Sequence, residues 1–295
     1  MKSGTVAVVG RANAGKSTLI NVIVGEKVAI VSPKPQTTRD RILGVLTESD
    51  YQIVFEDTPG FYKSKTELNK KMQKTARKTV KDVDVVLFVL DGHEGVMDED
   101  LELLKSVISS VPTIVAMSKT DIMPKENIPL NLVKIASVEG VSEIIPVSAR
   151  KNRNVKELIK TVLKYWPEQD KIFDSDIVSD KSEKFMIAEI MREKILLKLD
   201  KEIPHGVAIV VNVFERRKTG TYEINLDIVC EKQNHKAIII GKQGAMLKEI
   251  SAFARQDMEK FLGAKVFLTT FVKVEENWRD KQSLISEYGY KDIDL

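Results

Sequence analysis

A glycine-rich stretch near the amino terminus constrains this chain more than any other feature. Residues 10–17 match the pattern G-x-x-x-x-G-K-[ST] at every fixed position, between an apolar strand-like run and a helical pattern. In that context the backbone N–H groups of the loop and of the helix N-terminus form a cradle for phosphate groups. Lys16 is expected to reach the β- and γ-phosphates, and the Ser17 hydroxyl to bind Mg²⁺. We predict a nucleoside triphosphate site that includes Gly10, Arg11, Ala12, Asn13, Ala14, Gly15, Lys16, Ser17 and Thr18.

Length and composition indicate a globular protein of two domains. The chain has 295 residues, of which 43% are hydrophobic and 30% are charged, and this length exceeds that of most single domains. No apolar run is long enough to cross a bilayer, and the first residues lead into a strand rather than a signal-peptide core. The single cysteine, Cys230, excludes an internal disulfide, and we expect it to be buried in a strand. These features predict a cytoplasmic protein.

The order of strand-like and helical patterns predicts two domains of different class. Residues 5 to about 166 alternate apolar strand-like runs with helical patterns, which is typical of a mostly parallel α/β sheet with helices on both faces. A polar, aperiodic segment follows, and beyond it the order is helix, strand, strand, helix, G-x-x-G, helix, strand. We predict an α/β domain over 1–170, a linker over 171–181, and an α+β domain with a terminal tail over 182–295.

Three further motifs at the ends of predicted strands favour GTP over ATP. Residues 57–60 read D-x-x-G, in which the Asp holds the Mg²⁺ shell and the Gly N–H binds the γ-phosphate. Residues 118–121 read S-K-T-D and are similar to the guanine element N-K-x-D, where Ser118 replaces Asn and is expected to brace the phosphate loop less well. Residues 148–150 fit a base-clamping loop of the form S-A-[KR]. The predicted nucleotide contacts of these motifs and their neighbour are Asp57, Thr58, Pro59, Gly60, Phe61, Ser118, Lys119, Asp121, Ser148, Ala149 and Arg150.

The second domain carries a candidate nucleic-acid loop. Residues 238–244 read I-I-I-G-K-Q-G, and the glycines of a G-x-x-G loop let a nucleic-acid backbone approach closely. The net charge of +3 does not itself indicate a polyanionic partner, but residues 231–248 hold four lysines against one acid. We predict contacts with single-stranded RNA at Ile240, Gly241, Lys242, Gln243, Gly244 and Lys248.

A second basic run covers residues 63–81, with eight Lys or Arg against one acid. It is either a solvated helix face or a nucleotide-dependent contact with RNA or an anionic membrane.

These motifs, in this order, resemble those of the Era GTPases. The stretches GRANAGKS, PQTTRDR, DTPGF, SKTD and VSAR are followed by IIIGKQG, so the resemblance covers essentially the whole chain. It implies a P-loop GTPase domain joined to a type II KH domain. It also implies a monomeric, Mg²⁺-dependent GTPase that binds small-subunit (16S) ribosomal RNA near its 3′ end and assists maturation of the small ribosomal subunit. Members of the family are also found at the cytoplasmic face of the cell membrane.

The resemblance bears on catalysis at Thr38, Phe61 and Asn13. Thr38 is favoured over Thr37 as the switch residue that completes the Mg²⁺ shell, so the metal ligands are Ser17, Thr38 and Asp57. Phe61 stands where Ras-like GTPases carry the Gln that orients the attacking water, so intrinsic hydrolysis should be slow. Asn13 matches the residue that coordinates K⁺ in related GTPases, which predicts faster hydrolysis in K⁺ than in Na⁺. The residues assigned to catalysis are Lys16, Thr38, Gly60 and Asn13.

Two other functions remain compatible with the motifs. The chain could bind RNA constitutively, with a weak GTPase, or it could signal at a membrane surface through residues 63–81.

Overall fold

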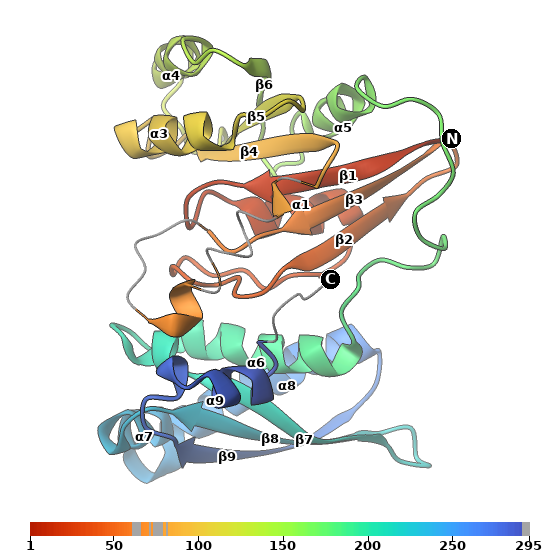
Figure 1. Cartoon of the computed structure of the whole chain (residues 1–295). Coiled ribbons are helices and arrows are strands. Elements are labelled where there is room, and N and C mark those ends of the chain that lie inside the picture. Colours follow the sequence, from red (N-terminus) through yellow and green to blue (C-terminus); the bar gives the residue numbers. More distant parts are fainter. Residues whose placement is uncertain (61–65, 71, 73–78, 81, 291–295) are drawn as a thin grey trace. The chain divides into compact units, whose positions relative to one another are not determined.

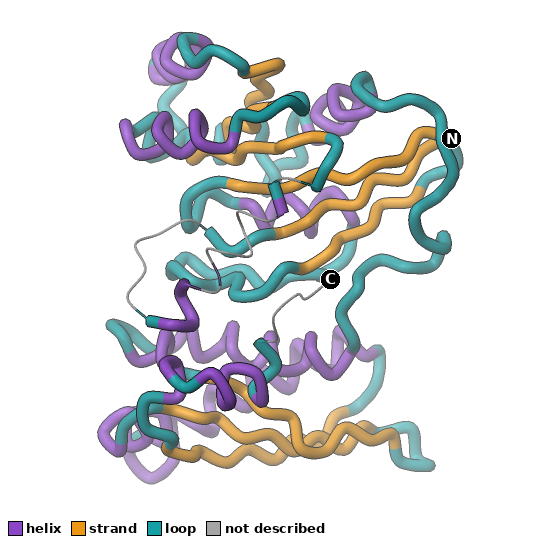
Figure 2. Tube along the Cα trace, in the orientation of Figure 1, coloured by secondary structure: helices purple, strands orange, loops and turns teal. Residues whose placement is uncertain are grey.

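The computed structural model describes residues 1–60, 66–70, 72, 79–80 and 82–290 (Figures 1 and 2). The chain divides into two compact units, which are treated separately below. The first unit consists of Met1–Ala29, Thr38–Lys63 and Met72–Asp180. The second consists of Ile30–Thr37, Ser64–Lys71 and Lys181–Leu295.

A six-stranded sheet forms the centre of the first unit. Its strand order is β2-β3-β1-β4-β5-β6. The pair β2–β3 is antiparallel, and the other four pairings are parallel. The strands are β1 (Lys2–Val9), β2 (Ile42–Thr47), β3 (Tyr51–Asp57), β4 (Val85–Asp91), β5 (Thr113–Ser118) and β6 (Val141–Pro146). The prediction of a mostly parallel α/β sheet is confirmed.

Helices cover both faces of this sheet, as predicted. Every residue of β4 is buried, because a central parallel strand is covered on both sides. The helices are α1 (Lys16–Val24), α3 (Asp98–Val107), α4 (Asn127–Ala136) and α5 (Val155–Leu163). On one face of the sheet, Val85, Leu87 and Val89 pack in a core with residues of α1 and α5. On the other face, Val86 and Phe88 pack in a core with residues of α3 and α4.

The segment predicted as a linker lies along strands β2 and β3. The N–H of Val45 donates to the carbonyl of Val178 at 2.9 Å, and Gly44 forms an isolated bridge with Ser179. The side chain of Gln52 binds the backbone of Phe173 through both its amide N and its carbonyl O. Paired backbone of this kind extends the edge of the sheet, so these residues belong to the first unit.

The second unit packs helices on a three-stranded sheet of order β7-β8-β9. Strands β7 and β8 form an antiparallel hairpin, and β8 and β9 are parallel, which requires the helical crossover between them. Side chains from α6, α7 and α8 share one buried core with the three strands. The elements are α6 (Glu183–Lys198), β7 (Ala208–Arg216), β8 (Tyr222–Cys230), α7 (Gln233–Ile240), α8 (Ala245–Leu262), β9 (Val266–Val274) and α9 (Gln282–Glu287). This is the predicted element order.

Cys230 is the last residue of β8 and is fully buried. The expectation of a buried strand cysteine is confirmed, and burial raises the pKa of its thiol. None of the helices in the described ranges has the length and hydropathy needed to span a bilayer.

Candidate nucleotide site and nucleic-acid loop

The phosphate loop connects β1 to α1, and its backbone geometry requires glycine. Gly10 has φ +147°, and a Cβ at this position would lie 2.2 Å from the carbonyl oxygen of Val89. Gly15, the residue before α1, has φ +100°, and no side chain caps the helix. The first N–H groups of α1 therefore remain available to a phosphate.

Lys16 lies inside this loop. Its Nζ donates to the carbonyl oxygens of Gly10 at 3.0 Å and Arg11 at 2.9 Å, and the residue is buried. Burial lowers the pKa of Lys16 to about 8, although the nearby carboxylate of Asp57 acts in the opposite direction. A bound phosphate would add further negative charge beside this buried ammonium group and favour its protonated form.

Three predicted metal ligands converge below the phosphate loop. Ser17 Oγ donates to Asp57 Oδ2 at 2.6 Å and lies 3.0 Å from Thr38 Oγ1, which is 3.3 Å from the same carboxylate oxygen. The second oxygen of Asp57 is buried and has no hydrogen-bond partner among the described residues. Burial raises the pKa of this carboxyl group. One carboxylate and two hydroxyls are oxygen ligands of the kind Mg²⁺ takes when phosphates and water complete its shell, so the donor set fits this ion.

The neighbouring threonine lies differently. The hydroxyl of Thr37 donates to the carbonyl of Lys34 at 2.6 Å and lies 3.1 Å from the hydroxyl of Ser32. Within the described residues, the hydroxyl of Thr38 is therefore the one placed at the carboxylate of Asp57.

The D-x-x-G segment closes against the phosphate loop. Thr58 Oγ1 donates to the carbonyl of Val8 at 2.9 Å, and Pro59 is buried. A Cβ on Gly60 would lie 2.9 Å from the N of Ala12 and 3.2 Å from Lys16 Nζ, so this position needs glycine for close approach. Phe61 and most of residues 63–81 lie outside the described residues, and the predictions for them stay predictions.

The guanine element is fixed to the phosphate loop by Ser118. The Ser118 hydroxyl donates to the carbonyl of Ala14 at 2.5 Å. We expected that a hydroxyl in place of the Asn amide would brace this loop less well. The Ser118 hydroxyl reaches the loop with this one hydrogen bond, and a weaker brace than that of Asn stays a prediction.

The carboxylate of Asp121 is oriented by the second base loop. Ser148 Oγ donates to Asp121 Oδ1 at 2.6 Å, and this hydrogen bond is the largest cause of the lowered pKa of Asp121. Thr120 binds the carbonyl of Val147 through both its N–H and its hydroxyl. Ala149 is half-buried and Arg150 exposed in the turn that follows. An ionised carboxylate held in this way is suited to accept the two donors on the guanine edge.

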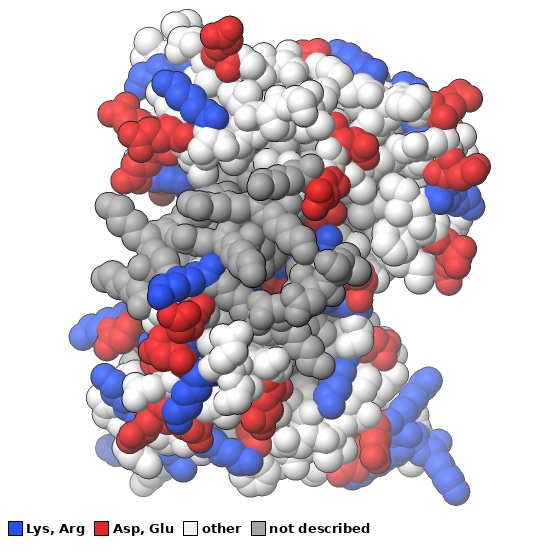
Figure 3. All heavy atoms as spheres, viewed as in Figure 1, with Lys and Arg blue, Asp and Glu red and all other residues white. Residues whose placement is uncertain are grey.

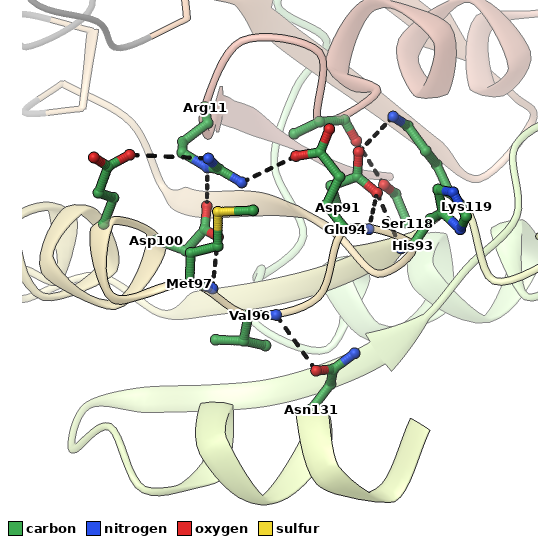
Figure 4. Close-up of polar contacts among 12 residues, drawn as sticks. Arg11, Asp91, His93, Glu94, Val96, Met97, Asp100, Ser118, Lys119 and Asn131 are labelled. Atoms are coloured by element: carbon green, nitrogen blue, oxygen red, sulfur yellow. Dashed lines mark hydrogen bonds and ion pairs between the residues drawn. The ribbon is translucent and has the colours of Figure 1, made fainter. Parts of the chain in front are cut away.

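Side chains that the sequence did not indicate connect these parts (Figure 4). Arg11 forms an ion pair with the buried Asp100 at 2.6 Å, and Lys119 forms one with the buried Asp91 at 2.5 Å. His93, to which the sequence assigned no role, lies with Nδ1 3.0 Å from the carbonyl of Ile122. The sequence feature that points to a role for Asp91 is its position directly after an apolar run.

The G-x-x-G loop joins α7 to α8 in the second unit and is open. Gly241 has φ +72°, and a Cβ there would lie 2.7 Å from the Cβ of Met246, so this glycine is needed for close approach within the loop. Gly244 has φ +79°, and a Cβ there would meet nothing within 4 Å. Gln243 also has a positive φ of 51°. Lys242 and Lys248 are exposed, as is Gln243, whereas Ile240 is half-buried. Two exposed lysines, Lys242 and Lys248, thus lie at the start of α8.

Exposed basic side chains also gather at the tip of the β7–β8 hairpin (Figure 3), at Arg216, Arg217 and Lys218. Arg217 is paired with Glu223 at 2.8 Å, so part of this charge is already neutralised.

Comparisons with known proteins agree with both units. Residues 5–119 match a family model described as a 50S ribosome-binding GTPase, and residues 202–279 match a KH domain model. GTPase Era of Clostridium kluyveri is 46% identical over 292 residues, which cover 99% of this chain and all of the relative. GTPase Era of Clostridium botulinum (strain Loch Maree) is 47% identical over 295 residues, with 99% of each chain covered.

Solved structures of Era proteins also match this chain over nearly its whole length. A tyrosine-to-alanine variant of Aquifex aeolicus Era bound to GDP·AlF4⁻ matches with a TM-score of 0.93 and 39% identity, and the match covers 98% of this chain and 99% of the other. A structure of Era in complex with MgGDPNP and nucleotides 1506–1542 of 16S ribosomal RNA matches with the same score, identity and coverage. The chain therefore belongs to the Era family and is a GTPase in which a P-loop GTPase domain is followed by a KH domain.

Proposed function

We propose that this GTPase is a GTP-dependent switch that binds small-subunit ribosomal RNA near its 3′ end and assists maturation of the small subunit. The observation that carries the proposal is the open G-x-x-G loop, with positive-φ glycines and exposed lysines, in a KH domain. Its Era relative was solved with such an RNA segment. We further propose that the protein acts as a monomer in the cytoplasm.

The nucleotide site assigns a separate task to each group. Lys16 and the N–H groups at the start of α1 hold the phosphates, and Gly60 brings its N–H to the γ-phosphate. Ser17, Thr38 and Asp57 would hold Mg²⁺, which when bound supplies positive charge against the phosphate oxygens. Because Thr38 and Gly60 both belong to segments that respond to the γ-phosphate, hydrolysis changes their contacts and so signals the nucleotide state.

Asn13 is the proposed source of additional catalytic help, through K⁺. It has φ +65° in the phosphate loop, and a potassium ion beside the phosphates would stabilise negative charge as an arginine does in other GTPases. Hydrolysis should be faster in KCl than in NaCl, and Asn13→Ala should remove the difference. Equal rates of the wild-type protein in the two salts would contradict the assignment.

The switch is tested by measuring RNA affinity in two nucleotide states. A fluorescently labelled RNA of the 16S 3′-terminal sequence is titrated with protein saturated with GDP or with GDPNP, and anisotropy gives Kd. We expect binding at least about tenfold tighter with GDPNP, equivalent to about 1.4 kcal/mol of coupling between nucleotide and RNA.

The RNA titration and a vesicle-binding assay together distinguish the competing functions. Equal affinities in the two states would show constitutive RNA binding with no switch. Binding of the full chain to anionic vesicles, unaffected by competing RNA, would instead favour a membrane-surface role for residues 63–81, and hence a peripheral location.

A further inference from the structure

The connection between β4 and α3, residues 92–97, contacts both ends of the nucleotide site within the first unit (Figure 4). We name it the β4–α3 loop. Asp91 stands at its start, as the last residue of β4, and Asp100 follows it in the first turn of α3.

At the base end, Asp91 holds both the loop and the guanine element. Its Oδ1 accepts from the N–H groups of His93 at 3.0 Å and Glu94 at 3.2 Å, and its Oδ2 accepts from Lys119 Nζ at 2.5 Å. The N–H of Gly92 donates to the carbonyl of Ser118 at 3.0 Å. Lys119 has φ +57°, a conformation that costs free energy in a residue with a side chain. The buried carboxylate therefore stabilises an otherwise disfavoured geometry next to Asp121.

At the phosphate end, the same loop and the helix after it hold Arg11. The Arg11 guanidinium pairs with Asp100 at 2.6 Å, Glu94 at 3.3 Å and Glu99 at 3.9 Å. Asp100 is 2% exposed, and its second oxygen accepts from the N–H of Met97 at 3.1 Å. Arg11 also supplies a carbonyl to Lys16 Nζ. Because the Arg11 guanidinium forms ion pairs with three acidic residues of the same unit, we assign Arg11 the role of positioning the phosphate loop and not that of a side-chain ligand of phosphate.

The middle of the loop is fixed from α4. The buried Asn131 accepts from the N–H of Val96 at 3.3 Å and donates to the carbonyl of Gly92 at 3.4 Å. Lys134 Nζ donates to the carbonyl of Val96 at 3.4 Å. The loop is therefore restrained by hydrogen bonds at its start, middle and end.

We propose that the β4–α3 loop links guanine recognition to the phosphate loop, with Asp91 and Arg11 as positioning residues at its two ends. Binding of the guanine base then restricts the positions of Lys119 and Asp91. Through the β4–α3 loop this restriction extends to Arg11, whose backbone carbonyl accepts a hydrogen bond from Lys16. The two ends should consequently be energetically coupled, although Arg11 pairs with Asp100 and Lys119 pairs with a different carboxylate, that of Asp91.

The test is a double-mutant cycle on GDP affinity with the full chain. Asp91→Asn keeps an oxygen for the loop N–H groups but removes the charge opposite Lys119, and Arg11→Gln removes the charge opposite Asp100. Each should weaken GDP binding about tenfold, because each removes a hydrogen bond between charged groups that is partly or fully buried. The double variant should lose only about 10- to 20-fold, since either single change already releases the loop.

A loss near a hundredfold in the double variant would mean that the two ends are independent, and it would overturn the proposal. Single losses under about twofold would overturn it as well. Asp91→Asn should raise KM for GTP while kcat at saturation stays within about twofold, a split that general destabilisation would not produce.

Two controls keep the test decisive. Glu143→Gln removes the exposed ion pair with Lys164, at 3.2 Å in the same unit, and should leave GDP affinity unchanged within about twofold. If Arg11→Gln does not fold, Asp100→Asn removes the charge of the same pair from the other side while keeping an oxygen for Met97.

Discussion

The phosphate loop and the G-x-x-G loop both place glycines before the first turn of a helix, yet their surroundings differ. The first glycine of each loop is tightly packed, since a Cβ on Gly10 would lie 2.2 Å from a backbone oxygen and a Cβ on Gly241 would lie 2.7 Å from the Cβ of Met246. The second glycines differ: a Cβ on Gly15 would contact Ser118 Oγ at 3.5 Å, whereas a Cβ on Gly244 would meet nothing within 4 Å. Ala14 and Lys16 of the phosphate loop are buried, and Ser17 is half-buried, while the side chains of Lys242 and Gln243 are exposed. The first loop is enclosed, as suits a single small ligand, and the second is open, as suits a polymer that must pass across it.

The largest expected effect is a difference in the free energy of unfolding between a substitution in the phosphate loop and one in the G-x-x-G loop. Gly10→Ala should lower the free energy of unfolding by about 3 kcal/mol or more, because the methyl group overlaps the carbonyl of Val89 at a positive φ. Gly244→Ala should cost only about 1 kcal/mol, from its conformation alone. Urea unfolding of both variants measures the difference, and equal losses would contradict the contrast between an enclosed and an open loop.

The next effect concerns the enclosed site and uses two adjacent threonines. Thr38→Val removes the hydroxyl beside Ser17 and Asp57, and should slow single-turnover GTP hydrolysis on the order of a hundredfold. Thr37→Val, the matched control, should change the rate less than about threefold. A rate lost equally in both variants would mean that the segment acts through its fold and not through the Thr38 hydroxyl.

A smaller effect is expected at Ser118, which holds the guanine element to the phosphate loop. Ser118→Ala leaves the carbonyl of Ala14 without this donor and should weaken GDP binding about tenfold, as measured by calorimetry. Ser118→Asn, which restores the usual family residue, should bind GDP at least as well as the wild-type protein. Unchanged affinity in Ser118→Ala would show that the short hydrogen bond does not contribute.

The smallest effect is a change in pH dependence. The hydrogen bond from Ser148 lowers the pKa of Asp121, so the carboxylate that accepts from guanine stays ionised in mild acid. GDP affinity should hold as pH falls and decline only through this lowered pKa. In Ser148→Ala the pKa of Asp121 should rise toward its ordinary value, so the decline should begin at a higher pH, with a loss under about threefold at neutral pH. Identical pH profiles of the two proteins would contradict the role of Ser148.

The phosphate loop and the G-x-x-G loop were both predicted from the sequence, because glycine spacing and the flanking apolar runs are local patterns that extend over about ten residues. The buried run of β4 and the α8 helix are cases in which local sequence and tertiary burial agree.

Contacts between distant residues could not be predicted in this way. The pairing of Arg11 with Asp100 joins residues 89 positions apart, and nothing in either neighbourhood marks them as partners. The hydrogen bond from Ser118 to the carbonyl of Ala14 likewise joins residues 104 positions apart, and the sequence alone does not give its length.

The central claim, that two glycine loops serve two different ligands, is tested most directly by Gly244→Asp. Asp tolerates a positive φ better than most residues, and its charge would repel a nucleic-acid backbone. Gly25→Asp is the matched control, since Gly25 also has a positive φ of 83° and nothing within 4 Å of a Cβ. GDP and the 16S 3′-terminal RNA are each titrated against both variants. The account predicts that Gly244→Asp weakens RNA binding on the order of a hundredfold and leaves GDP affinity unchanged, whereas RNA affinity equal to that of Gly25→Asp would contradict it.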